Sequence, residues 1–126
     1  MSTLKYRSRA MVEDLELGEC TIHRASGSAA ARWWQLWFYA PRDDDGQPEY
    51  FCVPVIPGGS YCAGPGGKTW GLNRASATTW QVSPSINVLS DQDAVSGTHE
   101  EPSIWHQTPL LVDVPDDEPW TNRQAP

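Results

Sequence analysis

The sequence carries side-chain types that bind nucleotides. Arg32, Lys68 and Arg74 supply cations for phosphate groups, and tyrosine and tryptophan rings supply flat surfaces on which a base stacks. Whether these residues converge depends on the fold. The candidate ligand-binding residues are Arg32, Tyr61, Lys68, Trp70, Arg74, Trp105 and His106.

A glycine- and proline-rich run spans residues 57–67. Both residue types oppose regular structure, so the run predicts a long flexible loop. Its successive backbone N–H groups favour an anion-binding nest, with Lys68 as the charge and Tyr61 as a stacking surface. The spacing differs from that of a phosphate-binding loop, so a mobile connection between strands stays the alternative.

The sequence contains no hydrolase elbow, Walker loop, Rossmann glycine fingerprint or zincin helix motif. His23, His99 and His106 are the candidate bases, with carboxylates such as Asp113 or Glu100 beside them. His106 lies in a predicted strand next to a tryptophan, a setting typical of a packed, hydrogen-bonded histidine. We therefore predict no catalytic residues.

Three cysteines, Cys20, Cys52 and Cys62, form no closely spaced pair. An odd number without such a pair argues against a disulfide framework and against a zinc ribbon. We expect reduced thiols and no cofactor.

The 126-residue chain has a net charge of -7, which indicates a single acidic domain. Direct nucleic-acid binding is disfavoured because phosphate neutralisation needs a basic face. The negative charge has two interpretations: the carboxylates imitate a phosphate backbone and occupy the groove of a basic protein, or they simply keep the domain soluble. The N-terminal residues lack an apolar run and no stretch is long enough to span a bilayer, so we expect a cytoplasmic protein without membrane contact.

Period-two patterns predict a β-rich chain in one domain of residues 19–114. Residues 1–18 are expected to be a lead-in with either a helical turn or the start of a strand, and residues 115–126 an acidic, proline-containing tail. The predicted fold is mainly β, a small antiparallel sandwich or barrel-like sheet with a long Gly/Pro loop. The expected strands are 19–24, 32–40, 49–55, 68–72, 78–82, 86–89, 103–106 and 110–114.

Residues 32–40 and 49–55 flank an acidic turn at 43–46 and predict a β-hairpin. The first strand has apolar side chains on both faces, so we expect it to be covered on both sides. The apolar edge of the hairpin offers an interface for a homo-oligomer.

Seven tryptophans are a high density for this length, and part of the set must be core. Trp34 and Trp37 fall on opposite faces of one strand, so each is expected in the core or in an interface. Trp120 either docks back on the sheet or anchors a partner.

Residues 79–86 read Thr-Trp-Gln-Val-Ser-Pro-Ser-Ile and follow the predicted strand that holds Trp70. This segment resembles a family of small phage and prophage proteins whose hallmark is Thr-aromatic-x-x-Pro-Ser-Ile after a tryptophan-bearing strand. Genome annotation sometimes mislabels its members as ammonia monooxygenases. Residues 103–106 and 114–120 are similar to the closing strands and terminus of that family, so the resemblance covers residues 33–120.

One position departs from the family. Many relatives carry a Cys-Pro-x-Cys knuckle after the first aromatic strand, where residues 38–41 read Phe-Tyr-Ala-Pro in this chain. The resemblance therefore implies that a metal site of the relatives is replaced by packing. The remaining candidate ligands, Cys52, Cys62, His99 and His106, have irregular spacing for tetrahedral zinc.

The resemblance implies a non-catalytic phage or prophage binding protein that acts inside the bacterial cell against a host factor, as an anti-defence protein does. Two mechanisms fit: sequestering a small nucleotide signal, or blocking a host protein through an acidic and aromatic surface. A structural or virion accessory protein is the second hypothesis. A small hydrolase using His106 or His99 is the third.

Overall fold

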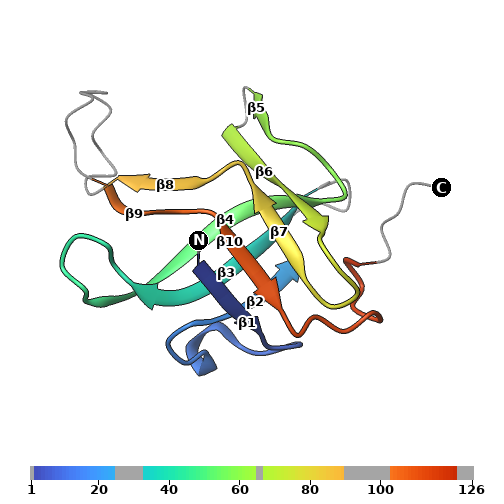
Figure 1. The fold of residues 1–126 in the computed structure, drawn as a ribbon, viewed down its shortest axis with the longest axis horizontal. Helices are drawn as coiled ribbons and strands as arrows, with labels where there is room; N and C mark the ends of the chain where they lie inside the picture. The colour runs from blue at the N-terminus through green and yellow to red at the C-terminus, as the bar shows by residue number, and fades with distance from the viewer. Residues whose placement is uncertain (1, 25–32, 65–66, 90–102, 122–126) are drawn as a thin grey trace.

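The computed structural model describes residues 2–24, 33–64, 67–89 and 103–121. These residues form a mainly β fold with one short 3-10 helix (Figure 1). The elements are β1 (Ser2–Tyr6), η1 (Val12–Asp14), β2 (Glu19–Arg24), β3 (Trp34–Pro41), β4 (Pro48–Pro57), β5 (Cys62–Gly64), β6 (Gly67–Arg74), β7 (Trp80–Ser83), β8 (Ile86–Leu89), β9 (Ser103–Gln107) and β10 (Pro109–Val112).

Seven strands close into a barrel in the order β4-β3-β2-β1-β10-β7-β6, and pairing between β4 and β6 completes the ring. The predicted mainly β, barrel-like fold is confirmed. The sheet is mixed and not antiparallel as predicted, because β1 runs parallel to both β10 and β2, and β4 runs parallel to β6. Parallel neighbours come from segments far apart in the chain, and a period-two pattern carries no information on their direction.

Residues 2–6, expected in a loose lead-in, are β1 and pair on both sides. Leu4 and Tyr6 point inward and are 2 % and 4 % exposed, while Thr3 and Lys5 between them face solvent. Two alternating apolar residues are too short a pattern to predict a strand from sequence. They are enough to form one when neighbouring strands pair with it on both sides.

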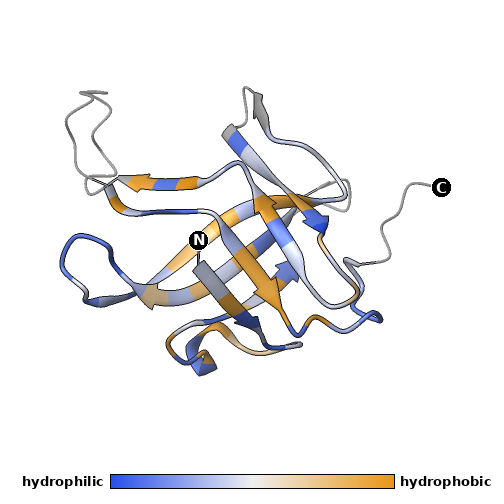
Figure 2. Cartoon of the chain, viewed as in Figure 1, coloured by the Kyte–Doolittle hydropathy of each residue, from blue (hydrophilic) through white to orange (hydrophobic). Residues whose placement is uncertain are grey.

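The barrel interior is filled from alternate positions of each strand, which Figure 2 shows as apolar residues along the barrel strands. In β3, Trp34, Leu36 and Phe38 are buried. Each buried side chain of this kind contributes about 1.5–3 kcal/mol of transfer free energy. The prediction that β3 is covered on both sides is wrong, because Trp37 lies on the half-buried outer face.

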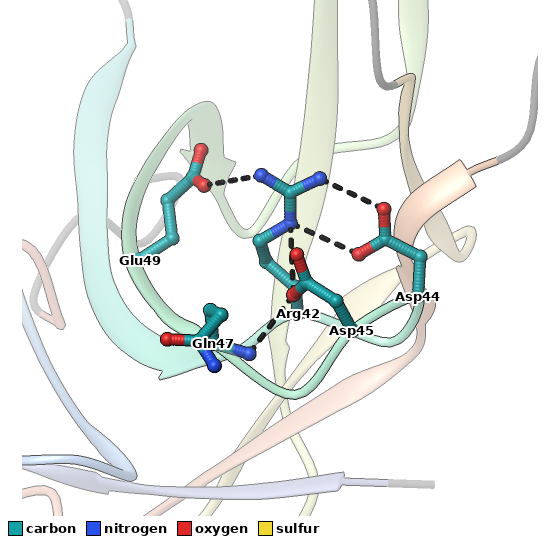
Figure 3. Close-up of polar contacts among 5 residues, drawn as sticks. All are labelled: Arg42, Asp44, Asp45, Gln47 and Glu49. Atoms are coloured by element: carbon teal, nitrogen blue, oxygen red, sulfur yellow. Dashed lines mark hydrogen bonds and ion pairs between the residues drawn. The ribbon is translucent and has the colours of Figure 1, made fainter.

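The predicted hairpin is confirmed as β3 and β4, which pair from Trp34 opposite Val55 to Pro41 opposite Pro48. Its turn is held by Arg42, which contacts Asp44, Asp45 and Glu49 (Figure 3). The hydrogen bond between Arg42 and Asp44 raises the pKa of the guanidinium and lowers the pKa of the carboxyl group. These acidic side chains therefore have a structural role in the turn.

Part of the predicted glycine loop is regular structure. Strand β4 continues to Pro57, β5 pairs with β6 from Cys62 opposite Thr69, and residues 65–66 lie outside the described residues. A Cβ atom on Gly71 would lie 2.5 Å from the Gly59 carbonyl oxygen. Glycine at position 71 thus lets the 58–60 segment pack directly on β6, so glycine serves close backbone approach in addition to flexibility.

Two further segments cover the barrel interior. The β8–β9 ribbon buries Trp105, whose ring centroid lies 4.7 Å from that of Phe38. The segment after β10 folds back so that Trp120 is 1 % exposed. Of the two alternatives for Trp120, the structure has the ring docked on the sheet.

In the ranges that the structure describes, the only helical element has three residues, and no helix there could cross a membrane.

Candidate functional site

Four of the predicted ligand-binding residues lie near one another where β5 and β6 extend past the barrel. Lys68 lies in this extension and Tyr61 comes just before β5. Trp70 pairs with Val55 of β4 where the barrel begins, and His106 comes from the neighbouring β9. Ser85, which sequence analysis did not select, connects the two groups through hydrogen bonds. We call Tyr61, Lys68, Trp70, Ser85 and His106 the rim site.

Tyr61 and Trp70 form an aromatic pair at the rim. Tyr61 lies one position before the Cys62–Thr69 pair of β5 and β6, which places it across from Trp70. The ring centroids are 5.7 Å apart and the ring planes meet at 75°. Tyr61 is 40 % exposed, so the pair presents an aromatic corner to solvent that can stack against a flat ligand.

The side chains of β6 explain how this corner is held. Lys68, Trp70 and Leu72 share one face of the strand because side chains alternate. Leu72 is fully buried, Trp70 is half-buried and packs against the core, and Lys68 is exposed. This face therefore runs from the barrel core out to solvent. Lys68 and Trp70 are two residues apart on it, which is a rise of about 7 Å along the strand.

A chain of hydrogen bonds joins the aromatic corner to the β8–β9 ribbon. The Trp70 indole N–H donates to the Ser85 carbonyl oxygen at 3.1 Å. The Ser85 hydroxyl oxygen lies 3.3 Å from Nε2 of His106. Both Ser85 and His106 are exposed, so a hydroxyl and an imidazole stand beside the rings.

Asp43 fixes the position of His106 from the β3–β4 turn. Its carboxylate accepts the His106 backbone N–H at 2.7 Å and a Gln107 side-chain N–H at 2.7 Å. The Asp43 backbone N–H donates to the Ile104 carbonyl at 2.6 Å. These bonds satisfy the outer edge of β9 and protect it from pairing with other strands.

Arg74 lies apart from the rim site, at the opposite end of β6. Its guanidinium carbon is 4.7 Å from the centroid of the Trp80 ring, and one nitrogen is 3.2 Å from a carboxylate oxygen of Asp116. Arg74 thus has a stacked and ion-paired position of its own. The other predicted cation, Arg32, lies outside the described residues.

Trp105 is corrected from a ligand-binding residue to a core residue. It is 1 % exposed and packs on Phe38 and Phe51. A ring enclosed by protein offers no face to a ligand. Sequence alternation could not separate Trp105 from His106, because which face of β9 turns inward depends on where the ribbon docks.

The predicted anion nest loses two of its donors. The Gly58 N–H donates to the Leu72 carbonyl at 2.7 Å, and the Gly59 N–H donates to the Ile56 carbonyl at 3.0 Å. The Gly59 carbonyl in turn accepts from the side chain of Asn73. These amides hold the 58–60 segment on β6 and are not directed at a ligand.

Among the histidines, Nε2 of His23 is bonded to the Ala10 carbonyl at 2.8 Å, and His99 lies outside the described residues together with Glu100. Asp113 is exposed, with a positive φ of 62°. Among the described residues, Ser85 and His106 come nearest to a pair of nucleophile and base. Both carboxylate oxygens of Asp43 accept hydrogen bonds from β9, one from the His106 backbone and one from the Gln107 side chain.

Two cysteines have described side chains. Burial raises the pKa of Cys20, and partial desolvation raises the pKa of Cys52 to about 11. Both thiols are therefore protonated near neutral pH, which disfavours metal binding and nucleophilic attack. In the described ranges, histidine, cysteine and carboxylate groups form no cluster of three that could hold a metal ion.

No family model matches this sequence, and no curated protein or solved structure does so either. The site must be interpreted from its own geometry.

Proposed function

We propose that this protein is a non-catalytic binding protein that holds a small nucleotide-type ligand at the rim site. The observation that supports this most is the exposed Tyr61–Trp70 corner, joined by hydrogen bonds to Ser85 and His106. Rings beside a hydroxyl, an imidazole and an ammonium group match a base, a ribose and an anionic group.

In this mechanism the base stacks on the exposed face of the aromatic corner. Stacking of a base on an aromatic side chain contributes about 1–3 kcal/mol. Lys68 offers charge to an anionic group, while Ser85 and His106 offer hydrogen bonds to hydroxyl groups or to base edges. The Trp70 ring is held by the core and by its hydrogen bond to the Ser85 carbonyl oxygen, so little ordering of this ring is needed on binding.

The phage and prophage resemblance suggests the biological setting. We propose that the protein acts in the cytoplasm of a bacterial host cell as an anti-defence protein that sequesters a nucleotide signal. Blocking a host protein is the second mechanism in this setting, and assembly into a homo-oligomer would serve either one. Neither requires membrane or direct nucleic-acid contact, and a structural or virion accessory role is the alternative without a ligand.

Isothermal titration calorimetry against mono-, cyclic and ADP-ribose-type nucleotides tests the proposal, with Tyr61→Ala as the variant. Loss of the Tyr61 ring should weaken binding by about 1–3 kcal/mol, or roughly 5- to 150-fold. Tyr50→Ala is a matched control, because Tyr50 is 41 % exposed and stacks on Tyr39 on the outer face of the hairpin. Equal effects of the two substitutions, or no binding of any nucleotide, would overturn the proposal.

The Ser85–His106 contact favours a second candidate, a small hydrolase in which His106 is the base and Ser85 the nucleophile. Mass spectrometry of the ligand recovered from the denatured complex separates the two functions. An intact ligand supports sequestration. A hydrolysed product that disappears in Ser85→Ala would establish the hydrolase instead.

A further inference from the structure

We infer that the ligand of the rim site carries at most one phosphate group, as a nucleoside, a nucleoside monophosphate or a cyclic mononucleotide does. This inference rests on the proposed function and specifies its ligand. Nucleoside di- and triphosphates are excluded as preferred ligands. The argument comes from the charges and hydrogen-bond donors around Tyr61 and Trp70.

The first observation is the supply of cations. Within the described residues, Lys68 is the one cation that the rim site contains. Arg74, on the same strand, is stacked on Trp80 and paired with Asp116. Arg42, on the turn beside β9, is bonded to Asp44 and also contacts Asp45 and Glu49 (Figure 3). One ammonium group can contact one phosphate group.

The second observation is the supply of backbone donors. Sites for di- and triphosphates cradle the phosphates with successive backbone N–H groups. The glycines next to Tyr61 could have served in this way, but the N–H groups of Gly58 and Gly59 are bonded to carbonyls of Leu72 and Ile56. Gly58 and Gly59 therefore offer no amide cradle to a second or third phosphate.

The third observation is nearby negative charge. The Asp43 carboxylate lies 2.7 Å from the His106 backbone nitrogen, at the side of the site opposite β6. The chain as a whole has a net charge of -7. Each additional phosphate charge is therefore repelled by the protein while Lys68 is already engaged.

The fourth observation is the neutral polar surface beside the rings. Asn87 pairs with His106 across the β8–β9 ribbon, and the Ser103 hydroxyl donates to the Asn87 side-chain oxygen. With Ser85, these residues give the exposed ribbon hydroxyl, carboxamide and imidazole groups. Such groups suit ribose hydroxyls and base edges better than they suit a polyphosphate.

Titration of the intact protein with adenosine, AMP, cyclic AMP, ADP and ATP, and with the matching guanosine series, tests the inference. Within one series, AMP or cyclic AMP should bind most tightly, and affinity should fall from AMP to ADP to ATP. Affinity that rises with phosphate number would overturn the inference and leave the proposed binding function standing. Failure of both complete series to bind would overturn both.

Lys68→Ala sharpens the same experiment. It should weaken AMP roughly fivefold, the value of an exposed ion pair, and leave adenosine unchanged. Lys5→Ala, an exposed lysine on the outer face of β1, is the matched control and should affect neither ligand. An equal loss for adenosine and AMP, or no loss for either, would contradict the role given to Lys68.

Discussion

Two tyrosine–tryptophan pairs in this molecule have nearly the same geometry and opposite surroundings. Tyr6 and Trp120 lie 5.6 Å apart at 69°, and Tyr61 and Trp70 lie 5.7 Å apart at 75°. Tyr6 and Trp120 are 4 % and 1 % exposed, whereas Tyr61 is 40 % exposed. Ring geometry alone therefore does not distinguish a core pair from a binding surface.

The polar groups around the two pairs account for the difference. The Tyr6 hydroxyl donates to the buried Glu118 carboxylate and accepts the Trp120 indole N–H at 3.0 Å. Ser8 also donates to Glu118, at 2.5 Å. At the enclosed pair, the bonds between Tyr6, Glu118 and Trp120 are buried. At the rim site, the hydroxyl and the imidazole that contact each other are both exposed to solvent.

The largest expected effect is a difference in stability loss between substitutions of Trp120 and Trp70. Trp120→Ala should lower the free energy of unfolding by about 3–5 kcal/mol, because it leaves a cavity against Tyr6 and Trp80. Trp70→Ala should cost about 1–2 kcal/mol, because that ring is only half-buried. Urea unfolding followed by circular dichroism measures both. Equal losses would show that the two pairs are equivalent, contrary to this comparison.

A smaller effect is expected at Gly71, where a substitution disturbs the exposed Tyr61–Trp70 pair without removing either ring. In Gly71→Ala the added methyl carbon would meet the Gly59 carbonyl oxygen at 2.5 Å. We expect a loss of about 1–3 kcal/mol and weaker nucleotide binding, because the segment that leads to Tyr61 must shift. Gly46→Ala serves as a control, since nothing lies within 4 Å of its Cβ position and only its φ of +76° strains the variant. Unchanged binding in Gly71→Ala would show that the 58–60 segment does not position Tyr61.

The smallest effect is a difference in pH dependence. Burial, and next the hydrogen bond to Glu118, raise the pKa of Tyr6 above its ordinary value of 10.0. The unfolded chain therefore releases this proton first, so stability is retained below pH 10.0 and falls as the pH rises above it. Tyr6→Phe should lose about 1–2 kcal/mol at neutral pH through the missing hydrogen bond and should then fall less steeply above pH 10.0.

The alkaline measurement has an internal control. Burial also raises the pKa of Cys20, and this thiol contributes the same alkaline loss in both proteins, so the difference between them reports Tyr6. Thermal unfolding monitored at several alkaline pH values gives the two profiles. Parallel profiles would mean that the Tyr6 hydroxyl is accessible to solvent, and the enclosed character of its pair would then be wrong.

Sequence analysis identified part of the rim site. Tyr61, Lys68, Trp70 and His106 were chosen for their chemistry, and they lie near one another in the fold. Ser85 was missed because a serine beside a proline has no distinctive chemistry. Trp105 and Arg74 have the same chemistry as these residues, and only their packing and pairing separate them from the rim site.

The sequence by itself determined the mainly β class and the β3–β4 hairpin, since a period of two and a turn are local properties. The tertiary structure decided which rings are covered. Burial of Tyr6 depends on Glu118, 112 residues away, and β1 lies between β2 and β10 from opposite parts of the chain. A local pattern places a side chain on a face of its strand, and only the long-range pairing of strands determines what covers that face.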